Sequence, residues 1–450
     1  MDLRPAAAGA AVGAAVRPGT CIPWSVRCAR VFLVWASKPG VAAFRGLRKM
    51  TPIKVIAGEA AEVQRGVVSR AMSTPVYLDC AATTPIDPRV LAKAIHLMSV
   101  DFGNAGSRTH AMGRTARAAA EHARDQVAAV VGATRGEVVF TSGATESNNL
   151  AILGLSHHGR RTGMKHLVST GIEHHAVLEP LQELQRDGFS LTLVPPGPGG
   201  RVDAAAVRAA VREDTLLVSM MHVNNETGVI QPIEAVAAAL TDHAAYFHVD
   251  AAQSFGKLLE PLRHPRIDLL SISGHKVHAP KGVGALVARR RAGSRPPLRP
   301  LMFGGGQELG LRPGTLPVHL TAGLGLAAEL AAAEAAERAA ACRLFRERLL
   351  AGLAPLDPML VGDPVHVVPH IVNLSFPGLD SDQVIEALAD CVAISSGAAC
   401  TSQSHTCSHV LTAMGLGGSQ LSGAVRLSWC HLTEDVDWGA VAQTIRRLRP

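Results

Sequence analysis

Aromatic side chains, charges and long apolar runs are scarce in this 450-residue sequence. Aromatic residues form 4% of the chain, with only 2 tyrosines, too few to predict a groove that stacks nucleic-acid bases on aromatic rings. No apolar stretch of membrane-spanning length is free of Arg, Lys or Gly, so we expect no membrane association. Hydrophobic residues make up 47% of the chain and charged residues 18%, which indicates a globular protein with a mainly aliphatic core.

Cysteine pairing motifs are also absent. The 8 cysteines include no Cys-x-x-Cys pair and form no regular framework. A disulfide scaffold is therefore not expected, and a reducing compartment fits the pattern. We predict that Cys342, on a helical stretch, and Cys391, beside Val392, are buried as small hydrophobic side chains.

The net charge of +7 arises in the first part of the chain. Residues 1–71 hold 11 Lys and Arg against 3 acidic residues, which leaves 33 basic and 34 acidic residues in 72–450. A nearly neutral remainder without a basic stripe predicts no direct nucleic-acid binding. We expect residues 1–71 to be a leader outside the fold. It is interpreted as sequence upstream of a start at Met72, or alternatively as an organellar transit peptide.

From residue 136 onward, short apolar runs alternate with amphipathic stretches. Strands are predicted at 137–140, 166–169, 190–195, 216–222, 246–250, 268–273 and 284–288. Helices are predicted at 145–155, 175–187, 203–213 and 232–241, with one long helix over 321–352. Such alternation predicts an α/β fold with a mainly parallel sheet covered on both faces.

The same pattern predicts two domains. Residues 88–335 would form the large α/β domain. Residues 72–87 and 336–450 would form a smaller α+β domain. Parallel sheets bind ligands at the carboxyl ends of their strands, so the residues that follow each apolar run are the candidates for chemistry.

Three of these strand ends carry polar residues. The segment Thr-Ser-Gly-Ala-Thr-Glu-Ser-Asn-Asn at 141–149 opens a helix, where small residues allow backbone amides to hold a phosphate, although an ordinary capping turn would look similar. Asp250 ends one strand, and Lys276 follows the next in Ser-Gly-His-Lys. An acid and a lysine one strand apart suit pyridoxal phosphate (PLP), because the acid can pair with the ring nitrogen while the lysine holds the aldehyde carbon as a Schiff base.

Longer motifs carry a family resemblance. The segments Ser-Ile-Ser-Gly-His-Lys at 271–276 and His-Val-Asp-Ala-Ala-Gln at 248–253 resemble class V, fold-type I PLP-dependent enzymes. Met-His-Val-Asn-Asn-Glu-Thr-Gly at 221–228 and Tyr-Leu-Asp-Cys-Ala-Ala-Thr-Thr-Pro at 77–85 are similar to cysteine desulfurases. The resemblance covers residues 76 to about 445 and implies the fold-type I transferase fold.

The resemblance implies roles for individual residues. Lys276 would bind PLP covalently, and His174 would stack on the ring and assist proton transfer, in preference to His175. Asn225 and Arg426 would bind the substrate carboxylate. The remaining cofactor-binding residues implied are Asp250 at the ring nitrogen, Gln253 at the ring hydroxyl, Asn225, and Ala144, Thr145, Ser273, His275 and Thr315 around the phosphate. Thr315 resembles a residue that reaches the neighbouring subunit's phosphate, so a homodimer is implied.

Cys400 is the implied nucleophile. It lies in a run of small residues at 395–402, which suits a loop that carries a thiol to a bound substrate. In the family the matching cysteine takes sulfur as a persulfide. A zinc site of Cys400, His405, Cys407 and His409 is the weaker alternative, because no Cys-x-x-Cys or second cluster accompanies it, and we expect no metal. A disulfide or sulfur relay between Cys400 and Cys407 stays open.

Four residues depart from the commonest family sequences: Cys80, Trp429, Cys430 and His431. Cys80 is expected near the substrate carboxylate. Its side chain could therefore alter how the substrate fits.

These predictions combine into one function. The chain is expected to be a homodimeric, PLP-dependent L-cysteine desulfurase that releases L-alanine and passes persulfide sulfur to an acceptor protein. The alternative function is that of a selenocysteine lyase. A catalytically silent scaffold protein of the same fold is disfavoured. Segments 102–108 and 311–317 look most like desulfurases of bacterial DNA phosphorothioation systems, with iron–sulfur or thio-cofactor assembly as the other pathway. A cytoplasmic location is expected, or an organellar one if the leader is a transit peptide.

Overall fold

The computed structural model describes residues 74–396 and 408–449. Residues 72–450 form one compact unit. Within the described ranges, every helix is too short or too polar to cross a membrane. The expectations for the leader at 1–71 and for Cys400, His405 and Cys407 lie outside the described residues.

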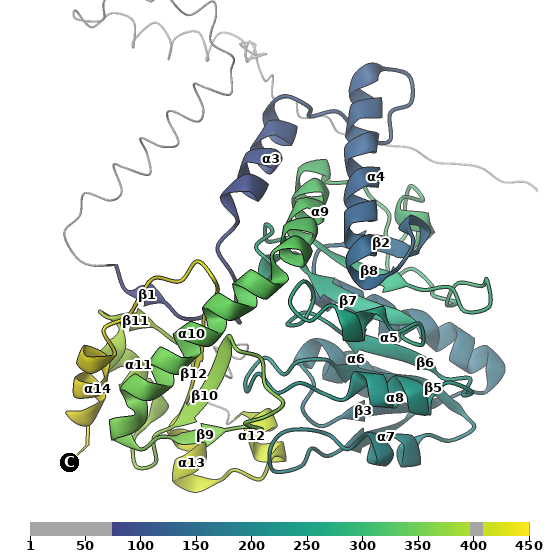
Figure 1. Ribbon diagram of the computed structural model, residues 1–450. Helices are drawn as coiled ribbons and strands as arrows, with labels where there is room; N and C mark the ends of the chain where they lie inside the picture. The colour runs from purple at the N-terminus through teal and green to yellow at the C-terminus, as the bar shows by residue number, and fades with distance from the viewer. Residues whose placement is uncertain (1–73, 397–407, 450) are drawn as a thin grey trace, which may run out of the picture. The chain divides into compact units, whose positions relative to one another are not determined.

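A seven-stranded sheet with the order β2-β8-β7-β6-β5-β3-β4 forms the centre of the larger part (Figure 1). Its strands are β2 (Val138–Thr141), β3 (His166–Thr170), β4 (Ser190–Val194), β5 (Thr215–Met221), β6 (Tyr246–Asp250), β7 (Leu269–Ser273) and β8 (Gly284–Ala288). Only β8 runs antiparallel to its neighbours in this sheet. The predicted mainly parallel sheet is confirmed, and all seven predicted strands are present within two residues of the predicted bounds.

The sheet is buried on both faces, which explains why its strands are continuous apolar runs. Neighbouring residues of one strand enter different cores: Leu269 packs in the core with Leu150 of α5 (Ala144–Thr162), whereas Leu270 packs in the core with Leu324 of α9 (Val318–Ala333). Side chains alternate between the faces of a strand, so each strand supplies both cores.

The four shorter predicted helices are present, although α5 runs seven residues beyond the predicted end at 155. The remaining helices of this part are α3 (Pro88–Ser99), α4 (Ala111–Val131), α6 (His175–Arg186), α7 (Ala204–Ala210) and α8 (Ile233–Ala239), of which α3 and α4 were not predicted. The single long helix predicted over 321–352 is wrong, because α9 ends at Ala333 and α10 (Ala335–Leu353) begins after Glu334. Glu334 leaves helical geometry with φ −105° and ψ 10°, and its carboxylate binds Arg89 and Arg338.

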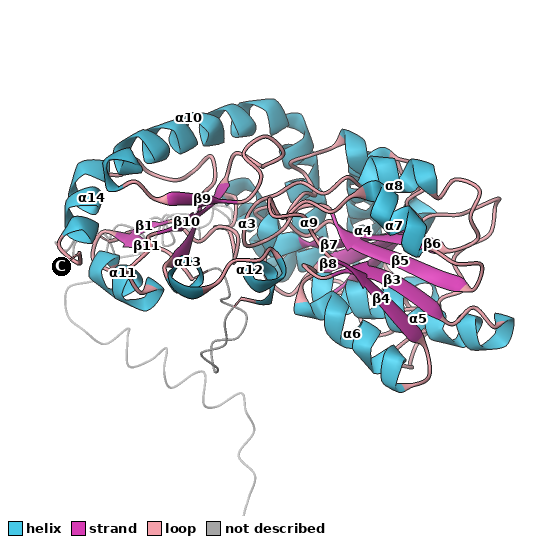
Figure 2. Cartoon of the chain, turned by 90° about the horizontal axis from the view of Figure 1, so that it is seen from below, coloured by secondary structure: helices cyan, strands magenta, loops and turns pink. Residues whose placement is uncertain are grey.

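A second, smaller group contains β1 and the elements that follow α10 in the chain (Figure 2). It contains an antiparallel sheet with the order β12-β10-β9 and a parallel pair of β1 and β11. Their bounds are β1 (Val76–Tyr77), β9 (Met359–Val361), β10 (Ile371–Ser375), β11 (Val392–Ala393) and β12 (Ala424–Ser428), with α11 (Ser381–Leu388), α12 (His409–Ala413), α13 (Gly418–Ser422) and α14 (Trp438–Arg446). The core of this group centres on Trp429, whose ring centroid lies 5.1 Å from that of Phe345.

The contact between α10 and α14 gives a stability prediction. A Cβ atom added at Gly352 would overlap the Cβ of Trp438 and lie 2.9 Å from its Cγ. Overpacking costs about 1–3 kcal/mol, more than the roughly 1 kcal/mol that alanine gains over glycine inside a helix. Gly352→Ala should therefore lower the urea midpoint of unfolding. Gly136→Ala is the control, since its Cβ would meet nothing nearer than 3.8 Å, and an unchanged midpoint for Gly352→Ala would contradict this packing.

Candidate active site

A cavity of about 540 Å³ lies at the carboxyl ends of the parallel strands. Ser142 follows β2, Asp250 ends β6 and Ser273 ends β7, and all three line it. Ten of the residues selected from the sequence line this cavity: Ala144, Thr145, His174, Asn225, Asp250, Gln253, Ser273, His275, Lys276 and Arg426. The structure thus brings together residues that are up to 282 positions apart in the chain.

Asp250 is a buried carboxylate with fixed partners. Its side chain is 6% exposed, Asn148 Nδ2 donates to Oδ2 at 2.7 Å, and the Ala252 amide donates to Oδ1 at 2.9 Å. Asn148 comes from α5, whereas Asp250 ends β6. Burying a carboxylate is costly unless hydrogen-bond donors or cations compensate it. These two donors provide that compensation and hold the carboxylate in one orientation facing the cavity.

Lys276 reaches the same cavity from the short helix η4 (Gly274–Lys276) that follows β7. The Lys276 ammonium donates to the carbonyl oxygen of Ala82 at 2.7 Å and also to that of Ala81. These carbonyls belong to the segment after β1, which lies close to η4 although it is almost 200 residues away in sequence. The contacts aim the amine at the cavity rather than at solvent.

Gln253 carries an unsatisfied acceptor. Its Nε2 donates to the carbonyl oxygen of Ala81 at 2.9 Å, while its buried Oε1 has no hydrogen-bond partner among the described residues. Buried polar atoms are nearly always paired. A ligand hydroxyl in the cavity would supply the missing donor.

His174 is the N-cap of α6, and its Nδ1 accepts the amide proton of Ala176 at 3.0 Å. A neutral ring therefore carries its proton on Nε2. Burial lowers the pKa of His174, the Asp250 carboxylate opposes this shift and the Lys276 ammonium adds to it. His175 does not line the cavity; it lies near Glu179, 3.5 Å away, and the ring of His409.

The residues at the start of α5 face Ser273 and His275 across a narrow gap. A Cβ atom on Gly284 of β8 would lie 2.6 Å from the Cα of Gly143, so glycine is required for this approach. Burial, with help from the charges of Lys276 and Lys281, lowers the pKa of His275 to about 4. Backbone amides at a helix start together with hydroxyl and ammonium groups form a site suited to a phosphate.

Arg426, on β12, lies across the cavity from the strand ends. It is 3% exposed, donates from Nη1 to the Asn225 carbonyl at 2.9 Å, and pairs through Nη2 with Asp79 at 2.7 Å. Its Nε is buried without a partner among the described residues. The guanidinium thus retains donor capacity for a carboxylate.

Some residues named from the sequence lie outside the cavity. Thr315 is exposed and does not line the cavity of its own chain; its implied partner is the phosphate of the neighbouring subunit. Cys80 does not line it either; its side chain enters a second cavity on the far side of the 78–84 segment, so the expectation that it sits near the substrate carboxylate is wrong. Cys342 is buried as predicted, whereas Cys391 is exposed, because it follows the end of α11 at the surface.

Sequence reasoning missed five residues that contribute to the site. Asn148 lies inside a quoted motif and Lys281 lies five residues after another, but neither had a role assigned, and nothing in their spacing points to Asp250 or to the phosphate site. Asp79 and the carbonyls of Ala81 and Ala82 act through pairings between distant segments. Such pairings leave no periodic signal in a sequence.

Residues 76–437 match the aminotransferase class-V family. The chain belongs to this family. The resemblance read from the motifs and the fold class are both confirmed. Enzymes of this family that desulfurate cysteine use PLP, and the cavity fits that cofactor, because the Asp250 carboxylate, the Lys276 amine and the orphaned Gln253 acceptor face one space.

Individual relatives narrow the function. The cysteine desulfurases IscS of Pectobacterium carotovorum and Escherichia coli are both 44% identical over 385 residues, which span 84% of this chain and 94% of theirs. Among solved structures, DndA from Streptomyces lividans is 51% identical with a TM-score of 0.70, covering 79% of this chain and 99% of that one. SspA in complex with cysteine is 37% identical with a TM-score of 0.69, covering 78% and 98%. The chain is a cysteine desulfurase by these relationships.

The contact between Asn148 and Asp250 can be tested directly. Asn148→Ala removes a hydrogen bond to a charged group, worth about 1.5–3 kcal/mol. We expect PLP affinity to fall roughly 10- to 100-fold, measured by titrating the apoprotein with PLP and following the visible Schiff-base absorption. Asn149→Ala is the matched control, because its side chain bonds only to the Thr145 carbonyl on its own helix. Equal affinity in both variants would show that Asn148 does not support the site.

Proposed function

We propose that this chain is a homodimeric L-cysteine desulfurase that converts L-cysteine to L-alanine and collects the sulfur as a persulfide on Cys400. The observation that carries the proposal is the shared cavity in which Lys276, Asp250, His174 and Arg426 meet. It contains a lysine for the cofactor, an acid for its ring, a histidine for proton transfer and an arginine for a carboxylate. A selenocysteine lyase would need the same four groups.

PLP, when bound, supplies an electron sink for the substrate carbons. In the proposal Lys276 holds it covalently, Asp250 pairs with the ring nitrogen and Gln253 accepts from the ring hydroxyl. Ala144, Thr145, Ser273 and His275 hold the phosphate together with the partner subunit's Thr315, and Asn225 contributes from the strand end after β5. The exposure of Thr315 in one chain accords with a role in the neighbouring subunit.

His174 and Arg426 would act on the substrate. The neutral His174 ring carries its proton on Nε2, the nitrogen that is not used for capping α6. That proton can pass to a substrate atom, and the lowered pKa keeps the ring neutral near pH 7. Arg426 and Asn225 would bind the amino-acid carboxylate, which fixes the thiol end of the substrate toward the remaining opening.

The flanks of the Cys400 segment are attached beside the cavity. On one side Ser395 donates from Oγ to Asp79, the partner of Arg426, at 3.2 Å. On the other side His409 donates from Nε2 to the carbonyl oxygen of Glu173, the residue before His174, at 2.9 Å. These contacts place Ser395 beside the partner of Arg426 and His409 beside the residue that precedes His174, which supports the assignment of the nucleophile to the segment between them.

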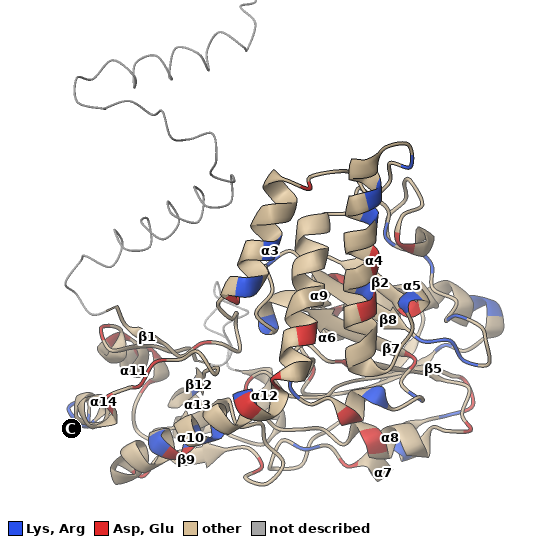
Figure 3. Ribbon diagram, turned by 45° about the horizontal axis from the view of Figure 1, so that its top comes forward, with Lys and Arg blue, Asp and Glu red and all other residues tan. Residues whose placement is uncertain are grey.

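The proposed persulfide chemistry also suggests the pathway and the location of the protein. The persulfide sulfur would pass to an acceptor protein in DNA phosphorothioation or in iron–sulfur and thio-cofactor assembly, with a cytoplasmic location. Figure 3 shows Lys and Arg interspersed with Asp and Glu over the described helices. This mixture supports sulfur transfer to a partner protein rather than direct nucleic-acid binding. We also propose that residues 88–335 form the large domain and that residues 72–87 and 336–450 together form the small domain.

Cys400→Ala tests the persulfide step. Release of alanine and sulfide from L-cysteine should fall to the background level while the PLP spectrum stays intact, because the nucleophile is lost but every cofactor contact remains. Cys391→Ala is the control, since this exposed thiol lies away from the cavity. Undiminished turnover in Cys400→Ala, with selenocysteine preferred over cysteine, would favour the lyase instead.

Arg426→Lys tests carboxylate recognition. A lysine cannot make the forked contact of a guanidinium, so we expect KM for L-cysteine to rise about 10- to 100-fold with a smaller change in kcat. PLP content is measured in parallel to exclude loss of cofactor. If KM stays unchanged in a variant that holds full PLP, Arg426 does not bind the substrate.

A further inference from the structure

A second cavity, of about 130 Å³, lies between the end of β12, the start of α10 and the residues after η4. It shares no lining residue with the active-site cavity. Its walls include an unusual number of potential metal ligands: Cys80, His278, Cys342, His370, Cys430 and His431. Neither the proposed reaction nor the PLP contacts use any of them.

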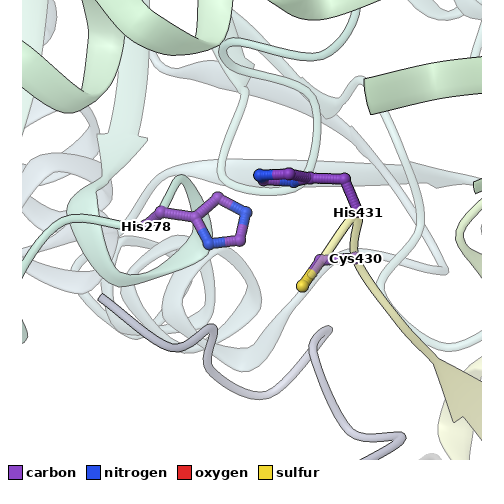
Figure 4. A group of neighbouring side chains, drawn as sticks. All are labelled: His278, Cys430 and His431. Atoms are coloured by element: carbon purple, nitrogen blue, oxygen red, sulfur yellow. The ribbon is translucent and has the colours of Figure 1, made fainter. Parts of the chain in front are cut away.

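Three of these residues converge on one point. A nitrogen of His278, the sulfur of Cys430 and a nitrogen of His431 all lie within 4.8 Å of one another. Figure 4 shows the two imidazoles and the thiol facing a common space. Ligands of a tetrahedral zinc ion are about 3.3–3.8 Å apart, given metal–ligand distances of about 2.0–2.3 Å. Small side-chain rotations would therefore suffice to close the cluster around an ion.

His278 is already oriented as metal-binding histidines are. Its Nδ1 lies 3.0 Å from the carbonyl oxygen of Pro85, and since a carbonyl can only accept, the proton is on Nδ1 and the lone pair on Nε2. Ligating histidines commonly donate their second ring nitrogen to such a carbonyl. The backbone of His278 is unusual too, with φ of 68°, a conformation that non-glycine residues adopt only when their surroundings require it.

Cys80 offers a fourth ligand, because it is buried and lines the same cavity as Cys430. A second, independent feature also points to a polar occupant. His370 lines the same cavity, is 7% exposed, and its Nε2 has no hydrogen-bond partner among the described residues.

We propose that His278, Cys430 and His431 bind a zinc ion, with Cys80 as the fourth ligand. Binding releases the two thiol protons to solvent, so two thiolates balance the charge of Zn²⁺ and no oxidant or reductant is needed. Balanced charge matters here, because the Lys257 ammonium also lines the cavity and would repel an uncompensated cation. Sulfur and imidazole ligands together favour zinc over magnesium or calcium.

The site would act as a structural clamp. Cys80 immediately precedes the carbonyl of Ala81 that Lys276 contacts, and His278 lies two residues after Lys276. Cys430 and His431 follow β12, which carries Arg426. One ion would thus connect the three segments that position the lysine and the arginine of the active site. A disulfide between Cys80 and Cys430 is the competing occupant, but it would leave the orientation of both imidazoles unexplained.

The test uses the full-length, PLP-loaded protein in a Cys400→Ser/Cys407→Ser background, which removes thiols that could hold metal elsewhere. We expect about one zinc per chain by elemental analysis after dialysis. Titration of the metal-stripped protein with Co²⁺ should give absorption bands in the red, outside the PLP spectrum. Cys430→Ser and His431→Gln should each weaken Co²⁺ binding by more than the roughly 10- to 100-fold typical of outer-shell changes.

Cys342→Ser is the matched control, because Cys342 is a buried thiol that lines the same cavity but is not one of the four proposed ligands. It should retain zinc and the Co²⁺ bands. Circular dichroism and the PLP spectrum show whether each variant is folded. Absence of zinc and of Co²⁺ bands, metal binding that Cys430→Ser and His431→Gln leave unchanged in folded protein, or a Cys80–Cys430 disulfide found by thiol counting would each overturn the proposal. None of these readouts depends on desulfurase activity.

Discussion

The meeting of a buried carboxylate and a half-buried amine in one cavity is the constraint on which the rest of the structure depends. Asp250 and Lys276 end neighbouring elements of a sheet that is covered on both faces. Water is largely replaced by protein there, so each charged group needs its own donors or acceptors. Asn148, the Ala252 amide and the carbonyls of Ala81 and Ala82 meet that need.

Those partners come from separate parts of the chain, so the fold must bring α5 and the segment after β1 to the same edge of the large sheet. The amide of Asn148 is supplied by α5, and the carbonyls by the segment after β1. That segment also pairs with β12 and β11, since Asp79 forms a bridge with Ser428 and β1 pairs with β11. The small group of strands is thereby attached to the active-site edge of the large sheet, and Arg426 arrives opposite the lysine.

The segment around Cys80 has two faces with different chemistry. Its backbone carbonyls face the active-site cavity, whereas the Cys80 side chain faces the cluster of His278, Cys430 and His431. Residues 80–82 form a turn in which the amides of Ala82 and Thr83 donate to the carbonyl oxygen of Asp79. This turn places the carbonyls and the thiol on different sides of the segment.

The sequence alone determined the strands, their mainly parallel arrangement and the residues at their ends, because short apolar runs and period-3.6 patterns are local and parallel strands share one carboxyl edge. It also indicated Asp250, Lys276 and His174 as members of one site. The break at Glu334, the support of Asp250 by Asn148, the pairing of Arg426 with Asp79 and the direction of the Cys80 side chain were decided only by the tertiary structure. Each depends on a partner that is distant in sequence or on the face toward which a side chain points, and neither property is encoded in residue spacing.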